Sequence, residues 1–471
     1  MESRTGLTFY NLSPFTLDRI LQEPDLLRTN LLAYVDGFSQ NVADLFTYYE
    51  FDKTVAKLDE HDRLFLVLQQ FASIDLSPEM GTLFEDLIRR FAAASNETAG
   101  EHFTPRDAVK LLVDLLTAND DDVLTGYPVR TVYDPTAGTG GMLSLLDERL
   151  RRMNPNAEVR LFGQELNDQS YAICKSELLG KGQDADGIAR GDTLKNDAHL
   201  TERFDYVLSN PPYGGDWKAS RTAVEKEIAV GGATNRFPGG TPAISDGQML
   251  FLQLVASKLR PVSEGGGRAG IVLNGSPLFT GGAGSGPSEI RRWLLESDLV
   301  DAIVALPTDM FYNTGIATYV WVLDNNKSAE RRGKVQLIDA RTFFTKLRRN
   351  VGSKNKELSK ADRQRVLDIY RDFDAQSEAN AEFSKVLTAQ DFGYREITVE
   401  RPLQLRFEVE DATIAAALAT KPADKLPDDG RSALEAALAS LRGRVWDHQP
   451  TFVLELKKAL KEHGVTAGAP L

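Results

Sequence analysis

The pattern of apolar and polar positions changes twice along the chain. Up to about residue 120, apolar residues recur at three- and four-residue spacing, as in 17–27, 42–51 and 80–91, which predicts helices. From about residue 128, short apolar runs alternate with longer amphipathic stretches, and the runs are 130–133, 159–163, 204–208, 269–273, 299–306 and 317–323. This alternation is typical of βα units around a mostly parallel sheet. After about residue 345 the chain is highly charged, and the pattern again predicts helices, at 366–373 and 432–461.

These changes predict an α/β protein in three parts. We expect an N-terminal helical domain at 1–120, a catalytic domain at 121–345 and a charged, helical C-terminal extension at 346–471. The length of 471 residues and the 42% hydrophobic content are enough for several domains with buried cores.

Charge and cysteine content further limit the classes of protein to which this sequence can belong. The chain has 55 Lys and Arg against 68 Asp and Glu, a formal charge of −13, which argues against a protein that grips nucleic acid over its whole surface. Cys174 is the single cysteine, so a reducing compartment is expected. The N-terminus has no apolar signal core, and no apolar run approaches the ~18 residues of a membrane span. We therefore expect a cytoplasmic protein that does not contact the membrane.

A glycine-rich turn is the strongest local signal for a ligand. Residues 134–141 read Asp-Pro-Thr-Ala-Gly-Thr-Gly-Gly and stand between the apolar run 130–133 and the helical pattern at 142–150. Such a turn lets a ligand approach the backbone, and the following helix start offers free N–H groups. The spacing fits neither a P-loop nor the GxGxxG motif of dinucleotide binders. Asp134 at the strand tip suits a ligand with a positive end, and a plain tight turn is the alternative.

Two further acids follow strand-like segments. Glu165 ends the run that begins at 159, where a carboxylate holds ribose hydroxyls in nucleoside-binding folds. Asp192 follows the next short segment and is a candidate acceptor for an adenine amine. Each could instead cap the helix or turn that follows it.

The tetrapeptide after the run 204–208 carries the catalytic prediction. It consists of Asn210, Pro211, Pro212 and Tyr213. The prolines stiffen the loop, and the Asn210 side chain and the Pro211 carbonyl can together accept the two protons of an exocyclic amine. Tyr213 offers a flat surface for a base, worth roughly 1–3 kcal/mol in stacking. For the tetrapeptide alone, a simple strand end is the alternative.

The order of these motifs along the chain, from 134–141 through Glu165 and Asp192 to 210–213, resembles that of the S-adenosylmethionine-dependent amino methyltransferases of DNA. In that family Asn-Pro-Pro-Tyr is typical of N6-adenine enzymes. Segments outside this set resemble the modification (M) subunit of type I restriction-modification systems, and they are 100–106, 191–194, 245–248, 275–279, 306–318, 391–394 and 400–403. The resemblance covers roughly residues 25–405.

The resemblance implies a class I methyltransferase core with a Rossmann-like fold that methylates the N6 amine of adenine in DNA. Asn210, Pro211, Pro212 and Tyr213 would hold an adenine that is flipped out of the duplex. S-adenosylmethionine would be bound by a larger set, which comprises Glu101, His102, Phe103, Thr104, Pro105, Asp134, Thr136, Ala137, Gly138, Thr139, Gly140, Glu165 and Asp192. For 101–105 an ordinary helix entry, with Thr104 as the cap, is the alternative. No metal is expected.

The resemblance also implies partners. The chain shows no target-recognition segment and no helicase motif, so we expect DNA, a specificity (S) subunit, a second copy of this subunit and possibly a restriction (R) subunit, with the tail 405–471 as a docking element. An adenine methyltransferase that stands alone or serves another defence system is an alternative. Further alternatives are a protein glutamine N5-methyltransferase and a catalytically silent scaffold subunit.

Three further features are weaker signals for a function, and each has a functional and a structural interpretation. Phe311 and Tyr312 are either a second aromatic surface for the base or part of the core. The basic residues Lys346, Arg348, Arg349, Lys354 and Lys356 contact phosphate or are solvated. The Gly-rich segment 214–241, with Lys218, Arg221 and Arg236, contacts DNA or closes over the site, and a disordered linker is the rival.

Overall fold

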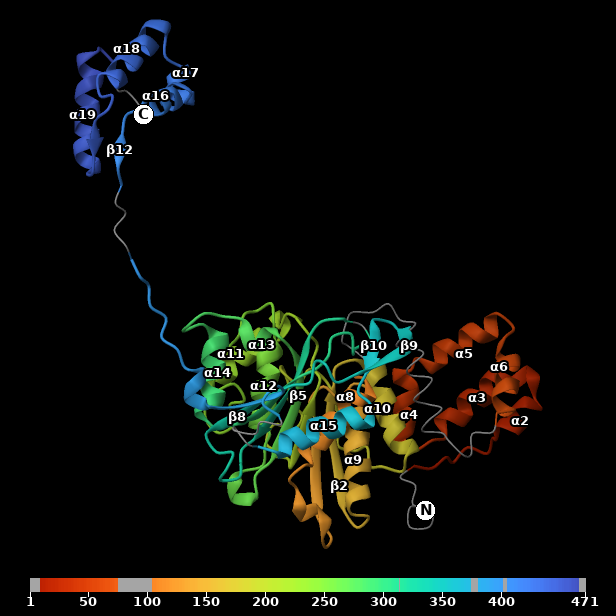
Figure 1. The fold of residues 1–471 in the computed structure, drawn as a ribbon. Coiled ribbons are helices and arrows are strands. Elements are labelled where there is room, and N and C mark those ends of the chain that lie inside the picture. Colours follow the sequence, from red (N-terminus) through yellow and green to blue (C-terminus); the bar gives the residue numbers. More distant parts are fainter. Residues whose placement is uncertain (1–8, 75–103, 313, 374–379, 401–404, 466–471) are drawn as a thin grey trace. The chain divides into compact units, whose positions relative to one another are not determined.

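The structure, a computed structural model, describes residues 9–74, 104–312, 314–373, 380–400 and 405–465 (Figure 1). The chain divides into two compact units, residues 1–395 and 396–471.

A nine-stranded sheet forms the centre of the first unit, with the strand order β11-β8-β6-β7-β5-β4-β1-β2-β3. The central pairs β3·β2, β2·β1, β1·β4 and β4·β5 are parallel, whereas β7 is antiparallel to both of its neighbours, β5 and β6. The strands are β1 (Val129–Asp134), β2 (Glu158–Glu165), β3 (Ile188–Arg190), β4 (Tyr206–Ser209), β5 (Arg268–Asn274), β6 (Val300–Ala305), β7 (Thr318–Asp324), β8 (Lys334–Asp339) and β11 (Ser384–Thr388). All six apolar runs of the central region therefore contain strands.

Helices cover both faces of this sheet, as Figure 1 shows. Because side chains alternate along a strand, Val132 and Val272 join the core on one face, while Tyr133 and Ile271 join the core on the other. The first face is covered by α8 (Arg106–Leu116), α9 (Gly141–Met153), α10 (Asp168–Gly180) and α15 (Lys360–Arg371). The second face is covered by α11 (Arg221–Val230), α12 (Gln248–Ser257) and α14 (Gly286–Glu296), and the short α13 (Ser276–Phe279) follows β5.

Helix α8 lies inside the range expected for the N-terminal domain, yet it packs tightly on the sheet. A Cβ atom added at Gly270 of β5 would lie 2.7 Å from Leu112 Cδ1, so the helix approaches the strand where the strand has no side chain. Four of the other N-terminal helices have a small core of their own around Ile20, Leu31 and Val55. They are α2 (Leu17–Leu21), α3 (Leu27–Asp36), α5 (Phe51–Glu60) and α6 (Leu64–Ala72). Helix α4 (Gln40–Tyr48) instead buries Leu45 in the core on the first face of the sheet.

The stretch after residue 345 differs from the expected helices. It begins with an antiparallel hairpin of β9 (Thr345–Val351) and β10 (Lys354–Glu357), and 384–388 adds the strand β11 to the edge of the large sheet. Strand β9 carries charged residues on an exposed surface, so it lacks the apolar run by which the inner strands are found. The expected helix at 366–373 is present as part of α15.

The second unit is helical. It contains α16 (Asp411–Leu418), α17 (Lys421–Asp424), α18 (Asp428–Ala439) and α19 (Gln449–Glu462), together with the two-residue strands β12 (Phe407–Glu408) and β13 (Val445–Trp446). Phe407 stacks on Phe452 with ring centroids 5.1 Å apart, and Trp446 packs beside them. These contacts give residues 407–465 an apolar core of their own.

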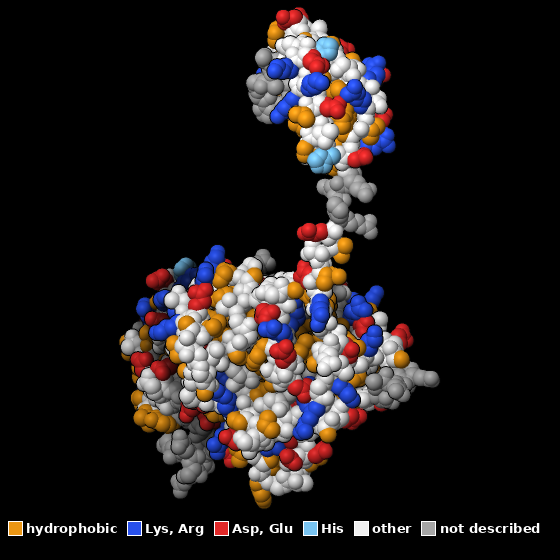
Figure 2. All heavy atoms as spheres, turned by 90° about the vertical axis from the view of Figure 1, so that its left-hand side faces the viewer, with side chains coloured by type: hydrophobic (Ala, Val, Ile, Leu, Met, Phe, Trp, Pro, Cys, Tyr) orange, Lys and Arg blue, Asp and Glu red, His pale blue; other side chains and the backbone are white. Residues whose placement is uncertain are grey.

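The negative charge is not gathered into one field on the face that Figure 2 shows, where acidic and basic side chains are interspersed in each unit. Within the described part of the chain, no helix has the length and apolar character needed to cross a bilayer.

Candidate functional site

The candidate residues of four different strands meet around one cavity. Strands β1, β2, β3 and β4 are neighbours and parallel, so the residues that follow their carboxyl ends lie at one edge of the sheet. A cavity of about 630 Å³ opens there. Its lining includes Thr136, Glu165, Asp192, Asn210 and Pro212.

The glycine-rich turn reaches this cavity with Pro135 and Thr136, whereas residues 137–140 do not line it. Gly138 and Gly140 have φ values of +53° and +83°, a region that residues with a Cβ atom rarely adopt. A Cβ atom at Gly140 would also lie 2.8 Å from Cys174 Sγ. The Ala137 amide donates to the Gln164 carbonyl at 3.0 Å, which ties the turn to the end of β2.

Asp134 is the last residue of β1 and lies beneath this turn. Its side chain is only 1% exposed and accepts hydrogen bonds from the Thr136 amide (2.9 Å) and the Thr136 hydroxyl (3.2 Å). Burial raises the pKa of Asp134 to about 7, and the negative charge of Glu165 acts in the same direction. Thr136 lines the cavity and links it to this carboxyl group.

The two other acids reach the cavity and also bond to nearby loops. Glu165 accepts from the Gly138 amide at 2.8 Å and from the Asn167 amide at 2.7 Å, so it joins the glycine turn to the start of α10. Asp192 accepts from the Leu194 amide at 3.0 Å, as in the capping alternative, and from the Ser220 hydroxyl at 2.7 Å. Both carboxylates nevertheless line the cavity.

The Asn210 carboxamide is held at both ends. Its Nδ2 donates to Thr104 Oγ1 at 2.9 Å, and its Oδ1 accepts from the Tyr213 hydroxyl at 2.7 Å. Burial raises the pKa of Tyr213, so its hydroxyl keeps the proton that it donates. The two bonds orient the carboxamide within the loop that follows β4.

Thr104 is therefore bonded to the loop 210–213 and does not occupy the cap position of α8. Pro105 occupies the cap position of α8, and the side chain there makes no capping hydrogen bond. Glu101, His102 and Phe103, which were expected to bind the donor, lie outside the described residues.

Phe311 belongs to the core, which is the second of its two interpretations, and its contact with a base stays a prediction. It is 4% exposed within the core, and its ring lies edge-on to the Tyr213 ring with centroids 6.1 Å apart. It thus supports the Tyr213 ring from the core side.

Several lining residues were not singled out from the sequence. Gln164 accepts from the Ala198 amide (2.9 Å) and donates to the Asn196 carbonyl (2.8 Å), which holds the loop that follows Asp192. Its position just before Glu165, at the end of an apolar strand, was an available signal. Phe251 of α12 also lines the cavity, but it lies in a continuous apolar helix pattern that marks it only as core.

The Gly-rich segment 214–241 is not a disordered linker. It contains the turn 218–220 and α11, and the Ser220 hydroxyl reaches Asp192. Within this segment Arg236 is not available to DNA, because it is 4% exposed and forms ion pairs with Glu227 at 2.7 Å and Asp197 at 3.2 Å. Lys218 and Arg221 are exposed.

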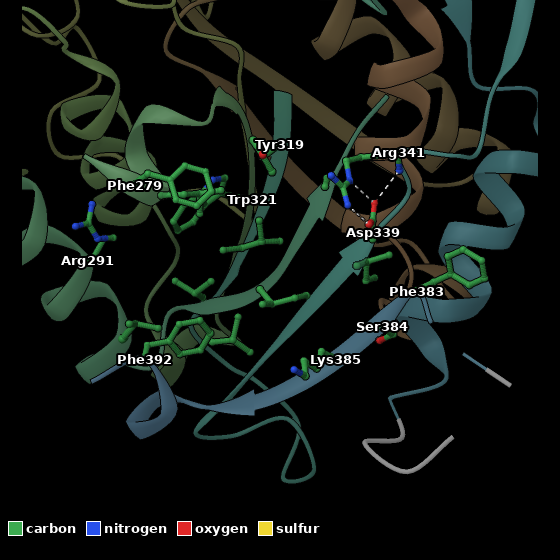
Figure 3. A pocket seen from close by; sticks show the side chains of 18 of the residues that line it. Phe279, Arg291, Tyr319, Trp321, Asp339, Arg341, Phe383, Ser384, Lys385 and Phe392 are labelled. Atoms are coloured by element: carbon green, nitrogen blue, oxygen red, sulfur yellow. Dashed lines mark hydrogen bonds and ion pairs between the residues drawn. The ribbon is translucent and has the colours of Figure 1, made fainter. Parts of the chain in front are cut away.

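A second cavity, of about 650 Å³, has a different character (Figure 3). Its walls come mainly from β6, β7, β8, β11 and α14 and are largely apolar, with Phe279, Trp321 and Phe392 among them. The Asp339 and Arg341 side chains pair with each other at its rim, at 2.6 Å. Neither Glu165 nor Asp192 nor Asn210 lines it, so it is separate from the candidate site. No cluster of potential metal ligands occurs among the residues with described positions.

Comparisons with known proteins agree with this arrangement. A profile of the family described as N-6 DNA Methylase matches residues 76–407. The MjaIX methylase subunit of a type I restriction enzyme from Methanocaldococcus jannaschii is 28% identical over 327 residues, which are 68% of this chain and 54% of that protein. The EcoKI methylase subunit from Escherichia coli is 29% identical over 259 residues, 51% of this chain and 43% of that protein. The chain thus spans about half the length of these relatives.

A solved structure has the same fold. The methyltransferase subunit of a type I restriction-modification system from Streptococcus thermophilus aligns with a TM-score of 0.66 and 24% identity, over 83% of this chain and 79% of that one. The likeness confirms the α/β fold with additional helices that the sequence predicts.

Proposed function

Because the chain belongs to the N-6 DNA methylase family, whose profile matches residues 76–407, we propose that it transfers a methyl group from S-adenosylmethionine to the N6 amine of adenine in DNA. We further propose that it does so as the modification subunit of a type I restriction-modification complex. The observation that carries the proposal is that Asn210 and Pro212 line the same cavity as Glu165 and Asp192. An amine-accepting loop and the acids suited to a nucleoside therefore face one space.

The residues of the cavity fit the methyl donor. Glu165 and Asp192 offer carboxylate oxygens to ribose hydroxyls and to an adenine amine, and the glycines of the turn leave the backbone open to close approach. The buried carboxyl group of Asp134 lies next to Thr136 and is suited to an α-ammonium group, whose charge would favour its ionised form. The bound donor supplies an electrophilic methyl group on a sulfonium centre.

The catalytic loop is suited to hold the target amine. Asn210 Oδ1 has two lone pairs, so it can keep the Tyr213 hydrogen bond and accept a second hydrogen bond from one N–H of the amine. The Pro211 carbonyl would accept a hydrogen bond from the other N–H, which turns the nitrogen lone pair toward the methyl group. The hydrogen bond to Thr104 keeps Asn210 Nδ2 turned away from the target amine. If the carboxamide were flipped, its own N–H donors would face the N–H donors of the amine. Because N6 lies within the stacked duplex, we expect the adenine to be flipped into the site.

Catalysis in this scheme depends on position and orientation. The chain would hold the two reactants in line. Such positioning alone lowers the activation barrier, by about 7–11 kcal/mol in well-oriented intramolecular reactions. No residue of the loop needs to become a strong base before methyl transfer, since the amine lone pair is the nucleophile and the methylated nitrogen releases its surplus proton to water afterwards.

The test is methyl transfer from labelled S-adenosylmethionine to genomic DNA, with and without a co-expressed specificity subunit. We expect label on N6 of adenine with the wild-type chain, and a loss of label but retained donor binding with Asn210→Ala. Label on a protein glutamine, or full activity of Asn210→Ala, would refute the proposal. The absence of donor binding by the wild type would instead indicate a silent scaffold.

We also propose that residues 396–471 dock the specificity subunit, with a second copy of this chain in the complex. The unit has its own apolar core and can be removed as a whole, whereas a cut at residue 432 would divide α18. A chain ending at residue 395 should keep donor binding and lose co-purification with the specificity subunit. Co-purification of the shortened chain at the wild-type ratio would contradict this assignment.

A further inference from the structure

The β9–β10 hairpin carries basic side chains of two kinds. Lys346, Arg348 and Arg349 are exposed on β9, and within the described ranges none of these three side chains has a hydrogen bond or an ion pair. Lys354 and Lys356 are committed to internal contacts instead. The structure therefore divides a cluster that looks uniform in the sequence into anchoring cations and free cations.

The anchoring cations attach the hairpin to the candidate site. Lys354 is 4% exposed, and its Nζ donates to Asp107 Oδ1 at 2.9 Å and to the Met310 carbonyl at 3.0 Å. The Ser353 amide donates to the Tyr312 carbonyl at 2.7 Å. These contacts hold the hairpin against the loop that follows β6, at the edge of the sheet where β1, β2 and β4 also end.

The anchored loop is in direct contact with the catalytic loop. Phe311, next to Met310 and Tyr312, contacts the Tyr213 ring, and Tyr213 bonds to Asn210. Asp107 lies three residues after Thr104, the other partner of Asn210. The hairpin is thus attached through short chains of contacts to both residues that orient the Asn210 carboxamide. In Figure 1 it lies at the upper margin of the first unit.

The free cations leave unbalanced positive charge on this hairpin. Lys346 stands directly opposite Lys356 in the antiparallel register, and like charges in such a pair repel each other. Lys356 is only partly offset by Asp309, whose carboxylate is 3.5 Å away. In a chain with a formal charge of −13, three exposed cations without carboxylate partners form a local site for a polyanion.

We propose that Lys346, Arg348 and Arg349 bind backbone phosphates of the DNA strand beside the flipped adenine. This inference rests on the proposed function, because the polyanion is taken to be the DNA substrate of the same site. The cations neutralise phosphates and release counterions, so they contribute affinity that does not depend on sequence and falls with salt. Through Lys354 and the loop 309–312, the hairpin brings this phosphate contact close to the catalytic loop.

The experiment measures DNA binding by the full-length chain as a function of salt. The test variant carries Lys346→Gln, Arg348→Gln and Arg349→Gln, and the control carries Arg152→Gln, Arg160→Gln and Lys385→Gln. The control residues are also exposed, remove the same charge and lie on α9, β2 and β11. The probe is a fluorescent DNA duplex containing one unpaired adenine, and the readout is fluorescence anisotropy between low and moderate salt.

We expect the plot of log affinity against log salt to lose about 2–3 units of slope in the test variant, since each phosphate contact contributes about 0.9. The control should keep the wild-type slope. At saturating DNA the test variant should methylate at the wild-type rate with a raised KM for DNA, and both variants should bind S-adenosylmethionine normally. A wild-type slope in the test variant, or an equal loss in the control, would overturn the proposal.

The design separates this proposal from the proposed function. If the wild type methylates adenine while the hairpin variant keeps the wild-type slope, only the phosphate assignment fails. If the wild type binds the duplex with a slope that depends on the hairpin but transfers no methyl group to adenine, the proposed activity fails and the phosphate contact remains. A wild-type chain without salt-dependent binding to the duplex would overturn the phosphate contact itself.

Discussion

Replacement of Thr104 by valine tests the proposed role of the orientation of the Asn210 carboxamide. Valine keeps the shape of the side chain but removes the oxygen that accepts from Asn210 Nδ2 at 2.9 Å. Asn210 is half-buried, so water does not freely replace the lost partner. A neutral hydrogen bond of this kind is worth about 0.5–1.5 kcal/mol. The same amount separates the correct amide orientation from the flipped one, in which an N–H group would face the target amine.

The expected loss of rate follows from that difference. A change of about 1–1.4 kcal/mol alters an equilibrium or a rate by about 5- to 10-fold, so we expect Thr104→Val to lower the single-turnover rate of methyl transfer by that factor. The measurement uses saturating donor and DNA, so that binding does not limit the rate. Thr104→Ser retains the acceptor oxygen and should restore most of the rate.

Two outcomes would refute this reasoning. One is a Thr104→Val enzyme with the wild-type rate, which would show that the carboxamide is oriented without the threonine. The other is a Thr104→Ser enzyme as slow as Thr104→Val, which would point to the methyl group of the side chain. A loss confined to donor affinity would instead support a donor-binding role for Thr104.

Three further changes test the buried parts of the site. Burial raises the pKa of Asp134 to about 7, so the folded state keeps a proton that the unfolded state loses near pH 4. The free energy of unfolding, measured by chemical denaturation, should therefore fall from about pH 4 to about pH 7 and then level off, and Asp134→Asn should remove this slope. Gly140→Ala adds a Cβ atom 2.8 Å from Cys174 Sγ at a φ of +83°. The backbone strain alone, about 1–2 kcal/mol, should weaken donor binding about tenfold in a calorimetric titration. Unchanged affinity would show that the turn does not need this conformation. Arg236→Gln leaves the Glu227 carboxylate without its cation, so it should destabilise the fold by about 3–5 kcal/mol and leave the salt dependence of DNA binding unchanged at temperatures where the variant stays folded.

The central sheet could be predicted from the sequence because its strands are buried on both faces. Strands β4 and β5 read as short apolar runs, and the order of acids after β1, β2 and β3 places them at one edge once the strands are parallel. The Asn210 loop follows the next strand in the sheet and reaches the same cavity. Local patterns were sufficient for these features.

Other features depend on contacts between distant residues. The bond from Asn210 to Thr104 joins positions 106 residues apart, and no local pattern marks either as a partner of the other. Charge alone did not separate buried Lys354 from exposed Arg348, or reveal that Arg236 is paired inside the protein. Strand β9 is exposed and charged, so it lacked the apolar alternation from which a strand is inferred.

The close packing of Gly140 against Cys174 makes the only thiol of the chain an internal reporter of the glycine turn. Cys174 is fully buried, and burial raises its pKa, so a thiol reagent reaches it only when α10 opens locally. The labelling rate then measures the free energy of that opening. A ligand seated on the turn would slow the labelling, so donor occupancy can be followed in the unmodified protein, without an introduced probe.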